Sequence, residues 1–140
     1  MKTGMVRKSV GMLAAFAAVA LIASCESEDT DSSITPARFY VDRDLVAYSD
    51  TDTFAWDTSN TSARLTYRID DFRSGDTNIR ILDGAGATVL TRTLMTGNDT
   101  IHLGSDSYEL VTTTASGKAG RWSIELRYDN FTGKTEVTLE

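Results

Sequence analysis

The clearest pattern along the chain is the alternation of apolar and polar residues in short runs. Residues 121–128 read RWSIELRY, in which every second residue is apolar. The same alternation occurs in residues 64–70 (RLTYRID), around Ile79 and Ile81, and in residues 136–140 (EVTLE). A period of two predicts β-strands with one buried face and one face in solvent.

Further short strands are expected in weaker runs, at residues 38–41, 45–48, 53–56, 88–95, 100–103 and 107–113. Glycine-containing turn signals separate the runs, as in residues 83–86 (DGAG) and 132–134 (TGK). After the first 25 residues, no window keeps an apolar period of 3.6 residues. Short strands with turns at intervals of about 8–12 residues are typical of antiparallel sandwiches and barrels. We therefore predict one all-β domain over residues 37–140, an antiparallel β-sandwich of jelly-roll or immunoglobulin-like type with roughly seven to nine strands.

Residues 1–24 have a different character from the rest of the chain. Three basic residues within the first eight positions precede an uncharged, mostly apolar stretch from Val10 to Ala23. This stretch of 14 residues is shorter than the roughly 20 residues that a membrane-spanning helix needs. A cleaved signal peptide is therefore expected in place of a retained membrane helix.

The apolar stretch ends in Ile22-Ala23-Ser24-Cys25, and Cys25 is the only cysteine of the chain. An aliphatic residue, two small residues and a cysteine in this position resemble the signal of bacterial lipoproteins. The resemblance implies removal of residues 1–24 and acylation of Cys25. It also implies a place in the bacterial cell envelope, at the outer membrane, on either the periplasmic face or the cell surface. An ordinary secretory signal that is cut elsewhere would leave Cys25 unmodified.

Residues 26–35 read ESEDTDSSIT and contain few bulky apolar groups. Such a segment buries too little surface to offset the entropy of ordering it. We expect residues 25–36, which begin with the lipidated Cys25, to form a disordered acidic tether between the lipid and the β-domain. An acidic run after the lipidated cysteine also resembles the surface-export signals of some bacterial lipoproteins.

Charge limits the range of partners. All 20 acidic residues follow Cys25, whereas three of the 14 basic residues precede it, so the formal charge is −6 for the whole chain and −9 for the part from Cys25 onward. An acidic surface repels phosphate backbones, and the basic residues are dispersed along the chain. Nucleic acid is therefore not expected as a partner. No motif predicts a cofactor, and with Cys25 lipidated no cysteine is left for a disulfide.

Few residues suggest reaction chemistry or metal binding. His102 is the only histidine and lies on the expected exposed side of a strand, and the chain has no G-x-S-x-G, H-E-x-x-H or Walker-type run. Loop aspartates at alternating positions suit calcium, which prefers oxygen ligands. Their spacing does not match an EF-hand loop, so no metal site is expected, and the weak calcium candidates are Asp42, Asp44, Asp50 and Asp52.

Aromatic residues are the other candidates for binding. Trp56 and Trp122 belong to apolar rows, so both are expected in the core. Exposed rings could stack on a ligand, and the weak candidates for this role are Tyr40, Tyr48 and Phe131.

Parts of the second half of the chain have a family likeness. The likeness lies in residues 78–86 (NIRILDGAG), in residues 120–126 (GRWSIEL), and in Gly133 followed by Val137 and Leu139. They resemble the small jelly-roll or immunoglobulin-like domains of secreted bacterial proteins, such as the pre-peptidase C-terminal type. The resemblance implies an accessory or binding role and no reaction.

The function expected from the sequence is a non-enzymatic, lipid-anchored binding or accessory module of the cell envelope. Its partners are the membrane, through the lipid on Cys25, and an envelope protein or a glycan. A passive structural lipoprotein is the alternative. A hydrolase is the third hypothesis, because a pair of catalytic carboxylates is defined by its spacing in three dimensions and not by sequence.

Overall fold

The computed structural model describes residues 30–95 and 107–140, which form six β-strands. They are β1 (Thr30–Thr35), β2 (Arg38–Thr58), β3 (Arg64–Leu82), β4 (Thr88–Met95), β5 (Tyr108–Thr113) and β6 (Gly120–Leu139). All pairings are antiparallel, and the strand order is β1-β2-β6-β3-β4, with β5 also paired to β3. The described part of the chain contains no helix with the length and hydropathy needed to cross a membrane.

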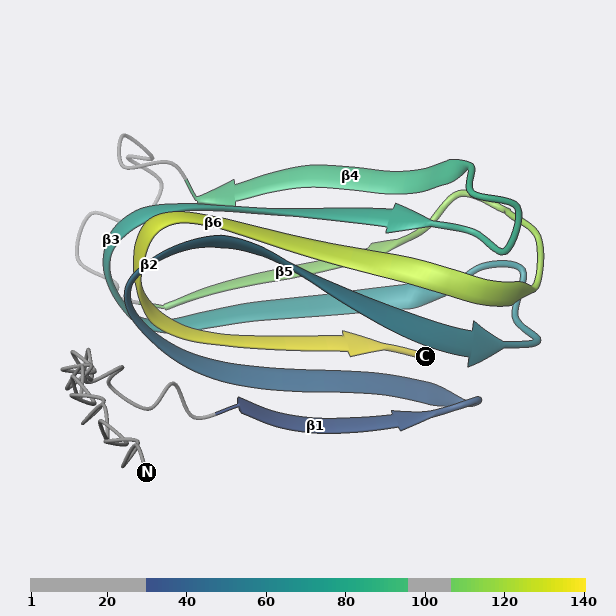
Figure 1. The fold of residues 1–140 in the computed structure, drawn as a ribbon, viewed down its shortest axis with the longest axis horizontal. Coiled ribbons are helices and arrows are strands. Elements are labelled where there is room, and N and C mark those ends of the chain that lie inside the picture. Colours follow the sequence, from purple (N-terminus) through teal and green to yellow (C-terminus); the bar gives the residue numbers. More distant parts are fainter. Residues whose placement is uncertain (1–29, 96–106) are drawn as a thin grey trace, which may run out of the picture.

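Strands β2, β3 and β6 are long, with 21, 19 and 20 residues, and each one bends back on itself (Figure 1). The pairing of β2 with β6 shifts register between Leu45 and Asp50, and the pairing of β3 with β6 shifts between Asp70 and Asp76. These irregularities increase the local bend of the strands. A single sheet is thereby folded into two layers.

The two layers share the bent strands. The first layer contains β1, the first half of β2, the second half of β6, the first half of β3, and β5. The second layer contains the second half of β2 (residues 50–58), the first half of β6, the second half of β3, and β4. The predicted antiparallel β-sandwich is confirmed. The expected seven to nine strands become six because each half of a bent strand has its own alternating pattern.

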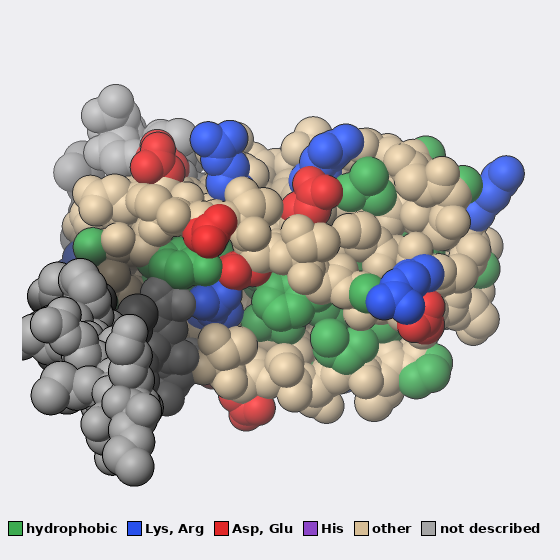
Figure 2. All heavy atoms as spheres, in the orientation of Figure 1, with side chains coloured by type: hydrophobic (Ala, Val, Ile, Leu, Met, Phe, Trp, Pro, Cys, Tyr) green, Lys and Arg blue, Asp and Glu red, His purple; other side chains and the backbone are tan. Residues whose placement is uncertain are grey.

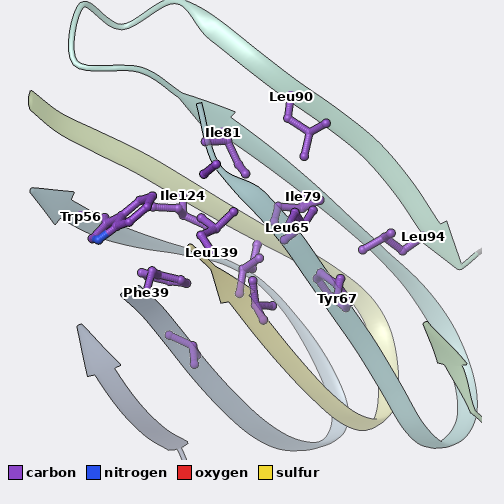
Figure 3. Close-up of a cluster of buried hydrophobic side chains, with 14 of the residues drawn as sticks. Phe39, Trp56, Leu65, Tyr67, Ile79, Ile81, Leu90, Leu94, Ile124 and Leu139 are labelled. Atoms are coloured by element: carbon purple, nitrogen blue, oxygen red, sulfur yellow. The ribbon is translucent and has the colours of Figure 1, made fainter. Parts of the chain in front are cut away.

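Inward-facing residues from both layers form one core, in which Trp56, Ile79 and Leu139 point into the space between the layers (Figure 3). Trp56 and Trp122 are fully buried, as predicted, and their rings meet edge to face with centroids 5.8 Å apart. The expected alternation is also confirmed in residues 121–128, where every second side chain is buried. Complete burial of an Ile, Leu or Phe side chain, as in this core, stabilises the fold by about 1.5–3 kcal/mol.

Each bend contains a residue with positive φ followed directly by an aromatic residue. The pairs are Ala47-Tyr48, Asp71-Phe72 and Asn130-Phe131, with φ of 49°, 52° and 47° at the first residue of each. This left-handed conformation is unfavourable for residues other than glycine, and least so for Asn and Asp. The aromatic rings then pack at the bends, with Phe72 and Phe131 centroids 5.8 Å apart.

The prediction of a disordered tether over residues 25–36 is wrong for residues 30–35, which form β1. Every side chain of β1 is exposed, so burial does not order this segment. Its order comes from the backbone ladder with β2 and from the tight turn at Pro36-Ala37. The Trp56 indole N–H also donates a hydrogen bond of 2.7 Å to the Thr35 carbonyl. Residues 25–29 lie outside the described residues, as do His102 and the strand expected at residues 100–103.

Candidate functional site

The four weak calcium candidates are separated by the fold. Asp42 and Asp44 lie on the outer face of the first layer, because they alternate with buried residues of β2. Asp52 points inward and pairs with Arg43. Asp50 lies at the bend, where its carboxylate accepts the Thr51 N–H at 2.7 Å. Among the residues that the structure describes, no group of three or more His, Cys, Asp or Glu side chains is arranged to hold a metal ion.

The most tightly bound polar cluster lies at the bend of β2. The Arg43 side chain is 7% exposed and forms an ion pair with Asp52, whose side chain is 19% exposed. The Tyr48 hydroxyl donates a hydrogen bond of 2.9 Å to the other Asp52 oxygen. The Arg43 guanidinium also lies 5.0 Å from the centroid of the Tyr48 ring, a cation–π contact.

Charge in this cluster is balanced internally. Burial by itself would lower the pKa of Arg43, but the Asp52 charge and the Tyr48 hydroxyl raise it, and the net pKa shift is upward. Burial and the hydrogen bond to Asp52 raise the pKa of Tyr48. The guanidinium therefore stays charged and the phenol stays neutral over the physiological range, which suits a structural role better than proton transfer.

Two further polar pairs lie inside the bends of β3 and β6. The Tyr67 and Thr77 hydroxyls are 3.0 Å apart, and so are the Tyr128 and Thr135 hydroxyls. Burial raises the pKa of Tyr67 and of Tyr128, so both phenols stay neutral at physiological pH. Each pair joins the two halves of one bent strand. Arg43–Asp52, Tyr67–Thr77 and Tyr128–Thr135 are called here the cross-bend pairs.

Asp83 is a buried carboxylate at the opposite end of the sandwich, 4% exposed. It accepts the backbone N–H groups of Ala85, Ala87 and Lys118 at 2.9, 2.9 and 2.7 Å. These hydrogen bonds, chiefly that from Lys118, lower the pKa of Asp83. A Cβ atom at Gly117 would lie 2.7 Å from the Asp83 Cβ, so only glycine fits there. The carboxylate therefore ties two loops together.

A shallow hollow lies on the outer face of the first layer, with a volume of about 410 Å³. Its lining residues are Thr30, Asp31, Asp42, Asp44 and Lys134. The Lys134 ammonium lies 3.1 Å from the Asp71 carboxylate, and this hydrogen bond raises the pKa of Lys134. We call this region the acidic hollow.

Two smaller hollows are also polar. One of about 220 Å³ on the outer face of the second layer is lined by Asp76, Asn78, Thr93, Arg127 and Asp129. The other, of about 110 Å³, lies over β3 and β5 and is lined by Arg68, Asp70, Ser107, Tyr108 and Glu109. These hollows are open and polar, whereas small-molecule sites are mostly apolar and enclosed.

The three aromatic candidates have different environments. Tyr40 lies on the outer face of the first layer, where the Arg38 guanidinium is 5.2 Å from its ring centroid. Tyr48 is half-buried and is held by Asp52. Phe131 is fully buried, so the expectation of an exposed ring is wrong. The left-handed conformation of Asn130 sends the next side chain inward.

Sequence reasoning did not single out Arg43 or Asp83. A signal for Arg43 was present, since it shares the phase of Phe39, Val41 and Leu45, and that phase is buried. A charged residue on a buried phase indicates an internal partner. The partner, Asp52, could not be chosen from the sequence because the bend determines the pairing.

Comparison with known proteins assigns no family to the chain. No family model and no curated protein matches the chain. The "infectious bursal disease virus VP2 subviral particle" aligns over 91% of this chain and 37% of its own, with a TM-score of 0.40 and 13% identity. The "Bacteriophage CBA120 tailspike protein 4 enzymatically active domain" aligns over 79% of this chain and 17% of its own, with a TM-score of 0.38 and 16% identity. This chain therefore spans well under half the length of either structure.

Proposed function

We propose that this protein is a lipid-anchored β-domain of the bacterial cell envelope that acts as a non-enzymatic binding module for a protein or glycan partner. The observation that carries the proposal is the run Ile22-Ala23-Ser24-Cys25, followed by the start of β1 at Thr30. Five residue steps separate Cys25 from Thr30, and a chain of that length reaches at most about 18 Å. A lipid on Cys25 would therefore hold the sandwich close to the membrane.

The direction of β1 indicates which end of the sandwich would be nearest to the lipid. Thr30 pairs with Arg43, close to the bend of β2, and β1 runs away from the bends toward Thr35 (Figure 1). The bends would then lie near the membrane and the loop held by Asp83 would lie far from it. The acidic hollow includes Thr30, so it would lie at the side of the domain near the anchor.

The arrangement of the described polar groups favours binding over catalysis. Arg43 and Asp83, the most buried charged groups, are both engaged within the fold, by Asp52 and by backbone amides. The described hollows are open and lined by carboxylates, amides, hydroxyls and cationic groups. Groups of this kind suit hydrogen bonds to a protein surface or to sugar hydroxyls.

Site-specific photocrosslinking in cells tests the proposal. A photoreactive amino acid at Tyr40, beside the acidic hollow, is expected to give an adduct of defined mass in the full chain. The same substitution in a Cys25→Ser background is the control, because that variant would lack the lipid and is expected to leave the membrane fraction and lose the adduct. If no adduct forms from Tyr40 or from any other exposed position, the domain is a passive structural lipoprotein and the proposal is wrong.

A further inference from the structure

The two layers of the sandwich do not end at the same place. On one side the first layer continues beyond β2 with β1, which pairs with residues 38–43. The second layer ends there with residues 50–58 of β2, which pair with β6. Among the described strands, none pairs with the other edge of residues 50–58. The second layer is therefore one strand short opposite β1.

Apolar side chains line this position. Ile34 on β1 is 42% exposed, although its pairing partner Phe39 is fully buried. Phe54 in the second half of β2 is only partly buried, and its ring meets Phe39 edge to face at 5.7 Å. Figure 2 shows apolar side chains gathered between β1 and the second half of β2. We call this region, bounded by Ile34 and Phe54, the edge groove.

Contacts between the layers define the two ends of the edge groove. The Arg43–Asp52 pair closes it at the bend, because inward-pointing charges discourage strand pairing there. At the other end, the hydrogen bond from Trp56 to Thr35 fixes β1 against the second layer. Three residues of β2, from Thr53 to Ala55, lie between Asp52 and Trp56, which corresponds to roughly 10 Å of strand.

The charges around the edge groove are mostly negative. Asp50 and Asp57 flank the open part of β2, whereas Asp31 on β1 belongs to the acidic hollow on the outer face. Asp57 has an ion pair with Arg121 at 3.9 Å, but both side chains are 73% exposed, so this pair is weak. Two copies of a chain with a charge of −9 after Cys25 would repel each other here. A basic partner is therefore favoured over a second copy.

We propose that the edge groove is a strand-addition site for an extended segment of a partner protein. Backbone hydrogen bonds to β2 would give affinity, as in other cases of β-strand addition. Alternate apolar side chains of the segment would cover Ile34 and Phe54, and the intervening lysines or arginines would face the aspartates. This inference rests on the proposed role as a binding module and specifies the chemistry of the partner.

A labelled peptide tests the site directly. The probe is a fluorescein-labelled acetyl-KVKVKVK-amide, titrated with the purified lipoprotein in detergent micelles and followed by fluorescence anisotropy at 0.15 M salt. Ile34→Arg is expected to weaken binding at least tenfold. Val111→Arg is the matched control, because Val111 is 45% exposed on β5 at the other edge of the first layer, and this variant is expected to bind as the unaltered protein does. Circular dichroism confirms that both variants fold.

The peptide KVKPKVK separates strand addition from simple charge attraction. It keeps the charge of the probe, but its proline lacks the N–H that a β-ladder requires, so its binding is expected to fall at least tenfold. Equal binding of the two peptides, equal effects of the two arginine variants, or no binding of the probe would each overturn the inference. Self-association that Ile34→Arg abolishes would assign the groove to a second copy and would overturn it too. An adduct from Tyr40 in cells without peptide binding would leave the binding module intact and reject only this site.

Discussion

The Arg43–Asp52 pair allows a quantitative test of how the bend of β2 is held. Replacing Asp52 by Asn keeps an acceptor for the Tyr48 hydroxyl but removes the charge opposite Arg43, whose side chain is only 7% exposed. Removing one partner of a fully buried ion pair typically costs about 3–5 kcal/mol. Asp52 is 19% exposed, so we expect the lower end of that range, about 3 kcal/mol. For a domain of this size the loss corresponds to a decrease in Tm of roughly 10–15 °C.

The single variants Arg43→Met and Asp52→Leu and the double variant Arg43→Met/Asp52→Leu form a thermodynamic cycle with the unaltered protein. Replacing both charges by apolar side chains is often neutral, so the stability of the double variant is expected to lie within about 1 kcal/mol of the unaltered protein. Urea unfolding at pH 7, followed by the fluorescence of the buried Trp56 and Trp122, measures each corner. If Asp52→Asn loses less than about 1 kcal/mol, or if the cycle shows no coupling, the pair does not hold the bend.

Three other variants address the backbone and the buried titratable groups. Ala47→Gly removes the unfavourable side chain at φ 49° and is expected to raise the free energy of unfolding by about 0.5–1 kcal/mol, and a lower urea midpoint would contradict the strain at this bend. The pKa of Asp83 is lowered in the folded state, so its stabilising effect is complete above the unfolded pKa of about 3.9 and is lost as the pH falls below that value. Calorimetry is expected to show a smaller loss of Tm between pH 5 and pH 2.5 in Asp83→Asn than in the unaltered protein, and parallel curves would refute this. The pKa values of Tyr67 and Tyr128 are raised, so the stability that they provide is present below the unfolded pKa of about 10 and is lost as the pH rises toward their folded values. Absorbance at 295 nm is expected to show two phenols that ionise only with unfolding in the unaltered protein and one in Tyr67→Phe. The free energy of unfolding of Tyr67→Phe is expected to be about 1 kcal/mol lower. Titration of all phenols before unfolding would show that the two hydroxyls are not buried.

Much of the fold follows from alternation alone. The buried phase of residues 121–128 and of residues 64–70 is the phase observed, and β4 covers the residues expected for it. The bends were not predictable in the same way. At Asp71 and Asn130 a polar residue with left-handed φ interrupts the pattern as any turn residue does, but here the strand continues on the other layer. Sequence distinguishes poorly between a turn that ends a strand and a bend that redirects it.

The candidate sites were harder to predict for the same reason. Asp42 and Asp52 belong to similar Asp-rich runs, yet one faces solvent and the other faces Arg43, because the bend reverses which phase is buried. Phe131 appeared in a polar loop context but packs against Phe72 from another strand. Segment 30–35 lacks apolar burial, and its order comes from backbone pairing that composition does not reveal.

We propose that a lipid on Cys25 places this β-sandwich at the membrane, and intact-mass spectrometry of the protein extracted from native membranes is the direct test. We expect a mass equal to residues 25–140 plus a diacylglyceryl group and, where the new amino terminus is modified, one further acyl chain. Fragmentation is expected to place the added mass on Cys25. An unmodified Cys25, or a chain that retains residues before it, would contradict lipidation at this position.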